Sequence, residues 1–187
     1  SGVSMKTVSR VFNHEPNVRP ETRARVEAAA KALNYRPNPS ARSLAGNRSY
    51  LLALVYDNPP GNYIIEVMSG ALEACESARY SLMMRPVDYD HRGHVDAIAD
   101  CVAQYAPDGL ILVPPLADDA ALRERLDALG VRRACISPQD AQAAIGVRLD
   151  ERSAVRELMA HLAGLGHRRI AHVKGRRDHG ATEWRLA

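Results

Sequence analysis

A short segment near the amino terminus carries side chains suited to hydrogen bonding with a polar or anionic partner. Ser4 is a good N-cap, because its hydroxyl accepts a backbone N–H that the first helical turn leaves free, and a helix is expected from Met5 to about Asn13. Apolar side chains share one face of this helix: Val8, Val11 and Phe12. Basic and polar side chains share the other face: Lys6, Ser9, Arg10 and Asn13. The spacing therefore predicts an amphipathic helix with a basic outer face.

A second set of polar residues follows directly on segments expected to be strands. In chain order they are Asp57, Asn58, Ser137 and Asp150. Ligands of open α/β sheets bind beyond the carboxyl ends of the strands, where such groups can hydrogen-bond to a polar ligand and the ring of Tyr63 can stack on it. Alternatively, Asp57 and Asn58 serve the turn beside Pro59 and Pro60, and Asp150 is a helix N-cap.

Strand-like and helix-like segments alternate from Leu51 onward. The expected strands are 51–56, 81–87, 109–113, 134–136, 145–149 and 170–173. The expected helices are 64–79, 95–106, 120–129 and 152–164. This alternation is typical of a doubly wound parallel sheet with helices on both faces. The fold class is therefore α/β, with a helical appendage before the sheet.

The appendage contains a second expected helix and a connector. Pro20 suits the first position of that helix, where its missing N–H removes no hydrogen bond. An apolar stripe follows and ends before Asn34: Thr22, Val26, Ala29, Ala30 and Leu33. Pro37 and Pro39 stiffen the segment that leads to the sheet.

Basic residues concentrate in the same region. Residues 1–48 hold nine Lys or Arg against three Glu, a net charge of +6 in a chain whose total is +3, so the remainder carries −3. A basic head on a mildly acidic body indicates a nucleic-acid contact at one end. The sequence has no apolar run of eighteen residues and no signal-peptide pattern, which favours a cytoplasmic protein without a membrane span.

The cysteines and histidines do not indicate a metal or a disulfide. The three cysteines stand far apart without CxxC spacing, which predicts core residues in a reducing compartment: Cys75, Cys101 and Cys135. The histidine pairs lack a third ligand in view, which favours surface or packing roles: His91 with His94, and His167 with His172. No cofactor is expected.

The string Gly2–Asn13 resembles the LacI/GalR (lactose repressor/galactose repressor) family of bacterial regulators. There G-V-S-x-x-T-V-S-R-V-x-N forms the turn and recognition helix of a helix-turn-helix. The likeness continues in family order over most of the chain, through Thr22-Arg23, 33–38, 41–45, 108–111 and 165–171. The resemblance implies a sequence-specific DNA-binding transcription regulator, in particular a repressor. Such a regulator acts as a homodimer on double-stranded operator DNA, is nucleoid-associated, and responds to a small effector such as a sugar.

The resemblance also assigns roles to residues of the head. Met5, Lys6 and Arg10 match the base readers, and Arg10 suits bidentate pairing to guanine. Short polar groups suit phosphate oxygens, which fix register: Thr7, Ser9 and Asn13. Residues of the connector are expected to bind DNA as well: Asn38, Ala41 and Leu44. Leu44 matches the hinge leucine that wedges into the minor groove. Alternatively, Met5 packs in the core and Leu44 packs on the sheet domain.

The family's domain organisation gives expected limits for this chain. They are a helix-turn-helix head (1–36), a hinge (37–48), the N-lobe of a periplasmic-binding-protein-like effector domain (49–140) and the start of its C-lobe (141–187). The family has a bracing helix before Gly2 and further chain after Ala187, so we expect this sequence to be part of a longer protein. Arg185 matches the effector-binding arginine of the family's R-L-x-G. Arg19 departs from the family pattern, which usually has a serine N-cap there.

Three other classes of protein were weighed against this interpretation. An enzyme is not expected, because the sequence lacks GxSxG, GxGxxG and a GK[ST] phosphate loop. A periplasmic sugar receptor would share the sheet domain, but the basic head argues against it. A protein-interaction module would use the head to bind partner helices, and its DNA binding would not depend on base sequence.

Overall fold

The computed structural model describes residues 1–12, 15–35, 48–57, 61–139, 145–175 and 180–186. These residues belong to two compact units, Ser1–Asn47 and Arg48–Ala187. Almost all of the expected hinge lies outside the described residues. The limits proposed for the head, the hinge and the two lobes therefore stay predictions.

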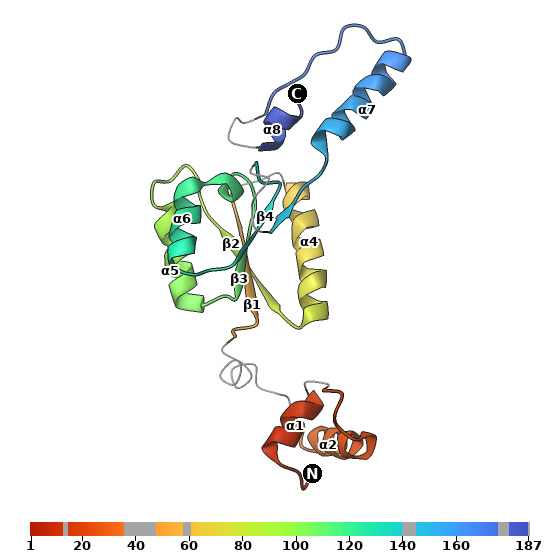
Figure 1. The fold of residues 1–187 in the computed structure, drawn as a ribbon, viewed down its shortest axis with the longest axis vertical. Coiled ribbons are helices and arrows are strands. Elements are labelled where there is room, and N and C mark those ends of the chain that lie inside the picture. Colours follow the sequence, from red (N-terminus) through yellow and green to blue (C-terminus); the bar gives the residue numbers. More distant parts are fainter. Residues whose placement is uncertain (13–14, 36–47, 58–60, 140–144, 176–179, 187) are drawn as a thin grey trace. The chain divides into compact units, whose positions relative to one another are not determined.

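The first unit contains the helices α1 (Met5–Phe12) and α2 (Pro20–Ala32), which pack on each other (Figure 1). Their small core includes Val11 and Val26, which are 1% and 2% exposed. The ring of Phe12 lies 5.7 Å from that of Tyr35, between centroids. The prediction that Leu33 belongs to the apolar stripe of α2 is wrong. The helix ends at Ala32, and Leu33 is 78% exposed.

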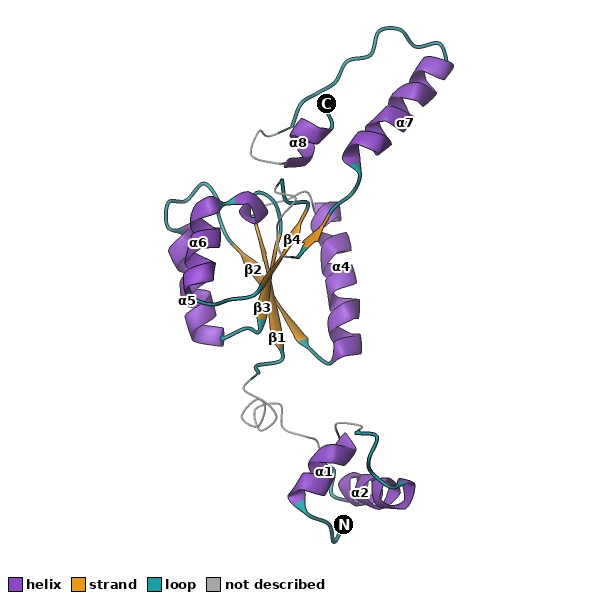
Figure 2. Cartoon of the chain, in the orientation of Figure 1, coloured by secondary structure: helices purple, strands orange, loops and turns teal. Residues whose placement is uncertain are grey.

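The second unit is built on a five-stranded parallel sheet in the order β2-β1-β3-β4-β5. The strands are β1 (Leu51–Tyr56), β2 (Ser81–Pro86), β3 (Gly109–Leu112), β4 (Arg133–Ile136) and β5 (Gly146–Val147). The helices are α4 (Gly61–Ala78), α5 (His94–Tyr105), the 3-10 turn η1 (Leu116–Asp118), α6 (Ala120–Ala128), α7 (Glu151–Gly164) and α8 (Gly180–Trp184). Figure 2 shows α4 on one side of the sheet and α5 with α6 on the other. The expected α/β class with a parallel sheet is confirmed.

The main core lies between the sheet and the layer formed by α5 and α6. Its fully buried members come from both layers: Ala53, Val55, Ile98, Leu110, Leu112, Leu116, Leu122, Leu126 and Cys135. Side chains alternate along a strand, so Leu54, which is 0% exposed, points to the opposite face, where α4 lies. The apolar run of β1 is thus buried from both sides, as expected of a central parallel strand.

The three cysteines are free and buried, which confirms the expectation that they are core residues. Burial raises the pKa of each thiol: Cys75, Cys101 and Cys135. A raised pKa keeps a thiol protonated and unreactive near neutral pH. These cysteines therefore act as packing residues.

Two features of the carboxyl-terminal segment differ from the expectation. Residues 170–173 were expected to form a strand, but the structure has no regular element there, and Val173 is 94% exposed. A strand needs a neighbour for its backbone hydrogen bonds, and no described strand pairs with this segment. The helix α8 was not expected at all.

In the described part of the chain, no helix has the length and apolar character needed to cross a membrane.

At the amino end of the sheet, the carboxylate of Asp108 binds the start of β1. Its Oδ1 accepts hydrogen bonds from the backbone N and the hydroxyl of Ser49, at 2.8 and 3.1 Å, and its Oδ2 accepts one from Tyr50 N at 3.1 Å. The Tyr80 hydroxyl bonds to the same group. Burial alone would raise the pKa of Asp108, but these hydrogen bonds outweigh it and lower the pKa. Asp108 therefore fixes the point at which the chain enters the sheet.

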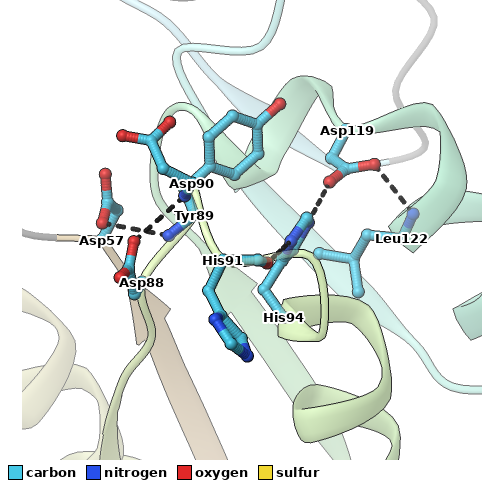
Figure 3. A network of polar contacts seen from close by, with 8 residues as sticks. All are labelled: Asp57, Asp88, Tyr89, Asp90, His91, His94, Asp119 and Leu122. Atoms are coloured by element: carbon cyan, nitrogen blue, oxygen red, sulfur yellow. Dashed lines mark hydrogen bonds and ion pairs between the residues drawn. The ribbon is translucent and has the colours of Figure 1, made fainter.

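At the carboxyl end, His94 joins the starts of two helices (Figure 3). Its Nε2 lies 2.6 Å from Asp119 Oδ2, and its Nδ1 lies 2.9 Å from the carbonyl oxygen of His91. Asp119 is also the N-cap of α6, because its Oδ1 accepts a hydrogen bond from Leu122 N at 3.0 Å. Since both ring nitrogens face oxygen acceptors, the geometry favours the doubly protonated imidazolium.

The charge environment of His94 agrees with this geometry. Burial lowers the pKa of His94, but the hydrogen bonds to Asp119 and His91 and the negative charges of Asp119 and Asp57 outweigh it and raise the pKa. The protonated ring therefore stabilises the contact between α5 and α6.

We expect the substitution Asp108→Asn to lower the free energy of unfolding by about 1–3 kcal/mol, because it removes a carboxylate that receives several hydrogen bonds. Thermal melting of this variant at neutral pH, beside Asp100→Asn on the exposed side of α5, measures the effect. Since the folded pKa of Asp108 is lowered, the difference between the variant and the wild type should shrink as the pH falls through that pKa. Equal melting of the two variants would contradict this role of Asp108.

We also expect a pH-dependent contribution to stability from His94. Because its folded pKa is raised, this contribution is complete below the unfolded value of about 6.5 and is lost as the pH rises through the folded pKa. The loss should be roughly 1 kcal/mol, the net value of one hydrogen bond. Melting curves from about pH 5.5 to about pH 8.5 should show a steeper decline for the wild type than for His94→Gln. Substitution of the exposed His161 by Gln should leave the slope unchanged, and a His94→Gln slope equal to that of the wild type would exclude the mechanism.

Candidate nucleic-acid interface and ligand-binding residues

The helix α1 presents a basic face to solvent. Ser4 starts the helix as expected, since its Oγ accepts a hydrogen bond from Thr7 N at 3.2 Å and lies 3.0 Å from Thr7 Oγ1. Lys6, Ser9 and Arg10 are exposed. Met5 is 89% exposed, so the alternative that it packs in the core is wrong. The side chains assigned to base contacts therefore lie on the accessible side of α1.

An arginine of α2 holds the end of α1. Arg23 Nη1 donates to the carbonyl oxygen of Val11 at 3.1 Å, and Nη2 donates to that of Glu15 at 3.0 Å. The last carbonyls of a helix have no partner within it, and Arg23 satisfies one of them while fixing the segment that follows. From the sequence, Arg23 was a basic residue and part of the family likeness, with no role assigned to it. Its role depends on a contact between two helices, which composition does not reveal.

Arg10 forms an ion pair with Glu15 in the same region. Arg10 Nε lies 3.4 Å from Glu15 Oε2, and both side chains are almost half exposed. The assignments of Asn13, Asn38, Ala41 and Leu44 to DNA lie outside the described residues and remain predictions.

The structure places the expected effector residues at several points of the second unit. Asp57 follows β1, and its Oδ1 accepts a hydrogen bond from Tyr89 N at 3.3 Å. Ser137 follows β4 with φ of +47°, an uncommon value for a residue other than glycine. Tyr63 lies in the first turn of α4 and is 39% exposed. Asn58 lies outside the described residues.

Asp150 is the N-cap of α7. Its Oδ1 accepts a hydrogen bond from Ser153 N at 3.1 Å, and its Oδ2 accepts one from the Ser153 hydroxyl at 2.8 Å. These bonds lower the pKa of Asp150. The N-cap alternative therefore describes what Asp150 does in this structure, and a contact with a ligand stays a prediction.

Arg185 pairs with Glu151, a residue that the sequence did not single out. Arg185 Nε lies 2.7 Å from Glu151 Oε2, and Nη2 lies 3.0 Å from Oε1, so the pair is bidentate. Glu151 is only 7% exposed. The hydrogen bond to Glu151 raises the pKa of Arg185. Burial and the negative charge of Glu151 also raise the pKa of Tyr63.

A cleft of about 560 Å³ lies beside this carboxylate. Its walls are Gln139, Arg148, Leu149, Asp150, Glu151, Arg152 and Trp184. The guanidinium carbon of Arg148 lies 5.6 Å from the centre of the Trp184 ring, within range of a cation–π contact. Of the expected effector residues that the structure describes, only Asp150 lines the cleft. The sequence analysis did not single out Trp184. Its position directly before Arg185 could have indicated a role, since a tryptophan ring is well suited to stacking on a sugar. Among the described residues, no group of three or more His, Cys, Asp or Glu is arranged to bind a metal ion.

Comparison with known proteins finds relatives that are similar over both units. Residues 1–38 match the family model described as "Bacterial regulatory proteins, lacI family". The lactose operon repressor of Escherichia coli strain K12 is 29% identical over 191 residues, which cover all of this chain and 52% of the repressor. The chain spans about half the length of the curated relatives it matches.

Solved structures give the same result. The lac repressor dimer bound to operator and the anti-inducer ONPF superposes with a TM-score of 0.72 at 28% identity, covering 99% of this chain and 56% of the repressor chain. A complex of the transcriptional regulator CelR with cellobiose superposes with a TM-score of 0.61 at 27% identity, with the same coverage. The match to the family model covers the head, and the likeness to the lac repressor continues through the sheet, so the chain is similar to regulators of the lacI family over both units.

Proposed function

We propose that this chain supplies the DNA-reading and ligand-sensing parts of a sequence-specific transcription regulator, a repressor controlled by a sugar or a related metabolite. The observation that carries the proposal is the exposed basic face of α1, on which Lys6 and Arg10 lie while Arg23 holds the end of the helix. A recognition helix must present such side chains to the major groove from a fixed support.

The proposal assigns different tasks to the residues of α1. Met5, Lys6 and Arg10 contact base edges, and Thr7 and Ser9 contact phosphates. Asn13, Asn38, Ala41 and Leu44 extend the same interface, with Leu44 as a minor-groove wedge. The lac repressor in its operator complex is a dimer, which supports a homodimer here and a pseudo-palindromic DNA site.

The ligand site is proposed in the cleft beside Glu151 and Trp184. The aromatic ring of Trp184, the carboxylate of Glu151, with which Arg185 pairs, and further charged groups together suit a polyhydroxylated ligand. The CelR complex with cellobiose supports the sugar class. Asp57, Asn58 and Ser137 follow strand ends and supply additional polar groups if the ligand extends along the sheet.

An enzyme and a periplasmic sugar receptor are weaker alternatives. The relatives are transcription regulators by name, such as the lactose operon repressor and the regulator Rv3575c of Mycobacterium tuberculosis, so we propose that the protein is not an enzyme and needs no cofactor. A regulator of this kind works on the chromosome, which places it in the cytoplasm at the nucleoid.

Selection of bound fragments from a random DNA pool tests the proposed DNA reading. We expect enrichment of a pseudo-palindrome, with affinity that falls by a log–log slope of about −0.9 for each phosphate neutralised as salt rises. The substitution Arg10→Ala should reduce discrimination at one base pair in each half-site by roughly 1–3 kcal/mol. Arg25→Ala, which removes an exposed positive charge from α2, should weaken all duplexes alike. The proposal would be contradicted if Arg10→Ala discriminated between base pairs as well as the wild type does. It would also be contradicted if no DNA sequence were enriched from the random pool.

A ligand screen tests the proposed sensor. Sugars and sugar phosphates that raise the melting temperature identify the ligand class. Arg185→Lys keeps a positive charge beside the buried Glu151 but loses the bidentate fork, so it should weaken ligand binding by about tenfold, equivalent to ~1.4 kcal/mol. The matched control is Arg156→Lys on the exposed side of α7. A ligand that binds Arg185→Lys as tightly as the wild type would exclude Arg185 from the site.

A further inference from the structure

The ion pair between Arg10 and Glu15 constrains the side chain that is proposed to read a base. Arg10 lies in the last turn of α1, and Glu15 follows the helix. Oε2 of Glu15 lies 3.4 Å from Nε of Arg10. An exposed ion pair contributes little to the free energy of unfolding. It can still restrict the orientation of the Arg10 guanidinium.

The backbone of Glu15 is fixed by two hydrogen bonds. Its N donates to the carbonyl oxygen of Arg10 at 3.0 Å. Its own carbonyl oxygen accepts a hydrogen bond from Arg23 Nη2 at 3.0 Å. Arg23 is partly buried and also binds Val11, so α2 fixes Glu15 and Glu15 in turn contacts Arg10. The backbone from which the Glu15 carboxylate extends is therefore fixed beside α1.

The guanidinium group has donors on two usable edges. Nε and one terminal nitrogen form one edge, and the two terminal nitrogens form the other. When Glu15 occupies Nε, the edge of terminal nitrogens stays available for the O6 and N7 atoms of a guanine. The same carboxylate disfavours a swing of Arg10 toward a phosphate, because the swing would leave Glu15 unpaired near the anionic backbone of DNA.

We propose that Glu15 is a positioning residue that sets specificity: it holds Arg10 through Nε so that the terminal nitrogens face a guanine edge. This inference rests on the proposed function and adds a residue that need not contact DNA itself. Glu15 makes Arg10 a reader of base sequence rather than a general phosphate contact.

The test compares Glu15→Gln with Glu21→Gln. Glu21 is exposed in the first turn of α2, so both variants remove one negative charge from the same unit. Affinity is measured for the selected duplex and for a duplex changed at the base pair that Arg10→Ala affects. Both variants should bind both duplexes somewhat more tightly, because repulsion from the phosphates falls. Only Glu15→Gln should lower the ratio of the two affinities, by about fivefold or more.

A double-mutant cycle separates orientation from any direct effect of Glu15. In the Arg10→Ala background, Glu15→Gln should leave the ratio unchanged, because there is no longer a guanidinium to orient. Glu15→Asp keeps the charge but shortens the side chain, and it should keep the overall affinity while losing part of the ratio.

The outcomes distinguish the inference from the proposed function. If the wild type discriminates between the duplexes and Glu15→Gln does so equally well, the positioning role is wrong and the proposed function stands. A Glu15→Gln effect that persists without Arg10 also overturns it. If the wild type shows no discrimination at all, the proposed function fails and this inference fails with it.

Discussion

Burial of β1 on both faces is the constraint on which the second unit depends. Ala53, Leu54 and Val55 are at most 1% exposed, which requires helices on both sides of the sheet and strands on both edges of β1. Parallel strands then bring all their amino ends to one edge and all their carboxyl ends to the other. One edge holds Asp108 and receives the chain from the first unit. The other carries Asp57 and Ser137, where ligands of such folds bind.

The first unit is stabilised in a different way, because two short helices bury little apolar surface. Val11 and Val26 form a small core, and Arg23 adds hydrogen bonds to the end of α1. In this arrangement the basic face of α1 does not contribute to the core of the first unit. The same arginine positions Glu15, so the support of the helix and the orientation of Arg10 are connected through one side chain.

Local signals made much of this structure predictable. The cap at Ser4, the proline at the start of α2 and the apolar run of β1 act within a few residues, and the elements they indicate are present. Contacts between distant residues were not predictable in the same way. Arg185 and Glu151 are 34 residues apart in sequence, and no local pattern indicates that they pair. The apolar residues 170–173 looked like a strand, but strand formation depends on a neighbour that the sequence of the segment cannot supply. Asp150 suited both a ligand contact and an N-cap, and only the position of Ser153 shows that it caps α7.

We propose that α1 is the surface that meets DNA while the α/β unit stays free to sense a ligand. Amide chemical shifts of isotopically labelled protein, titrated with a selected duplex, test this most directly. We expect the largest shift changes in Met5–Phe12 and at Glu15, with the amide shifts of β1 and β3 unchanged. Changes centred on the exposed basic residues of α2 or on the sheet, with α1 unaffected, would contradict it.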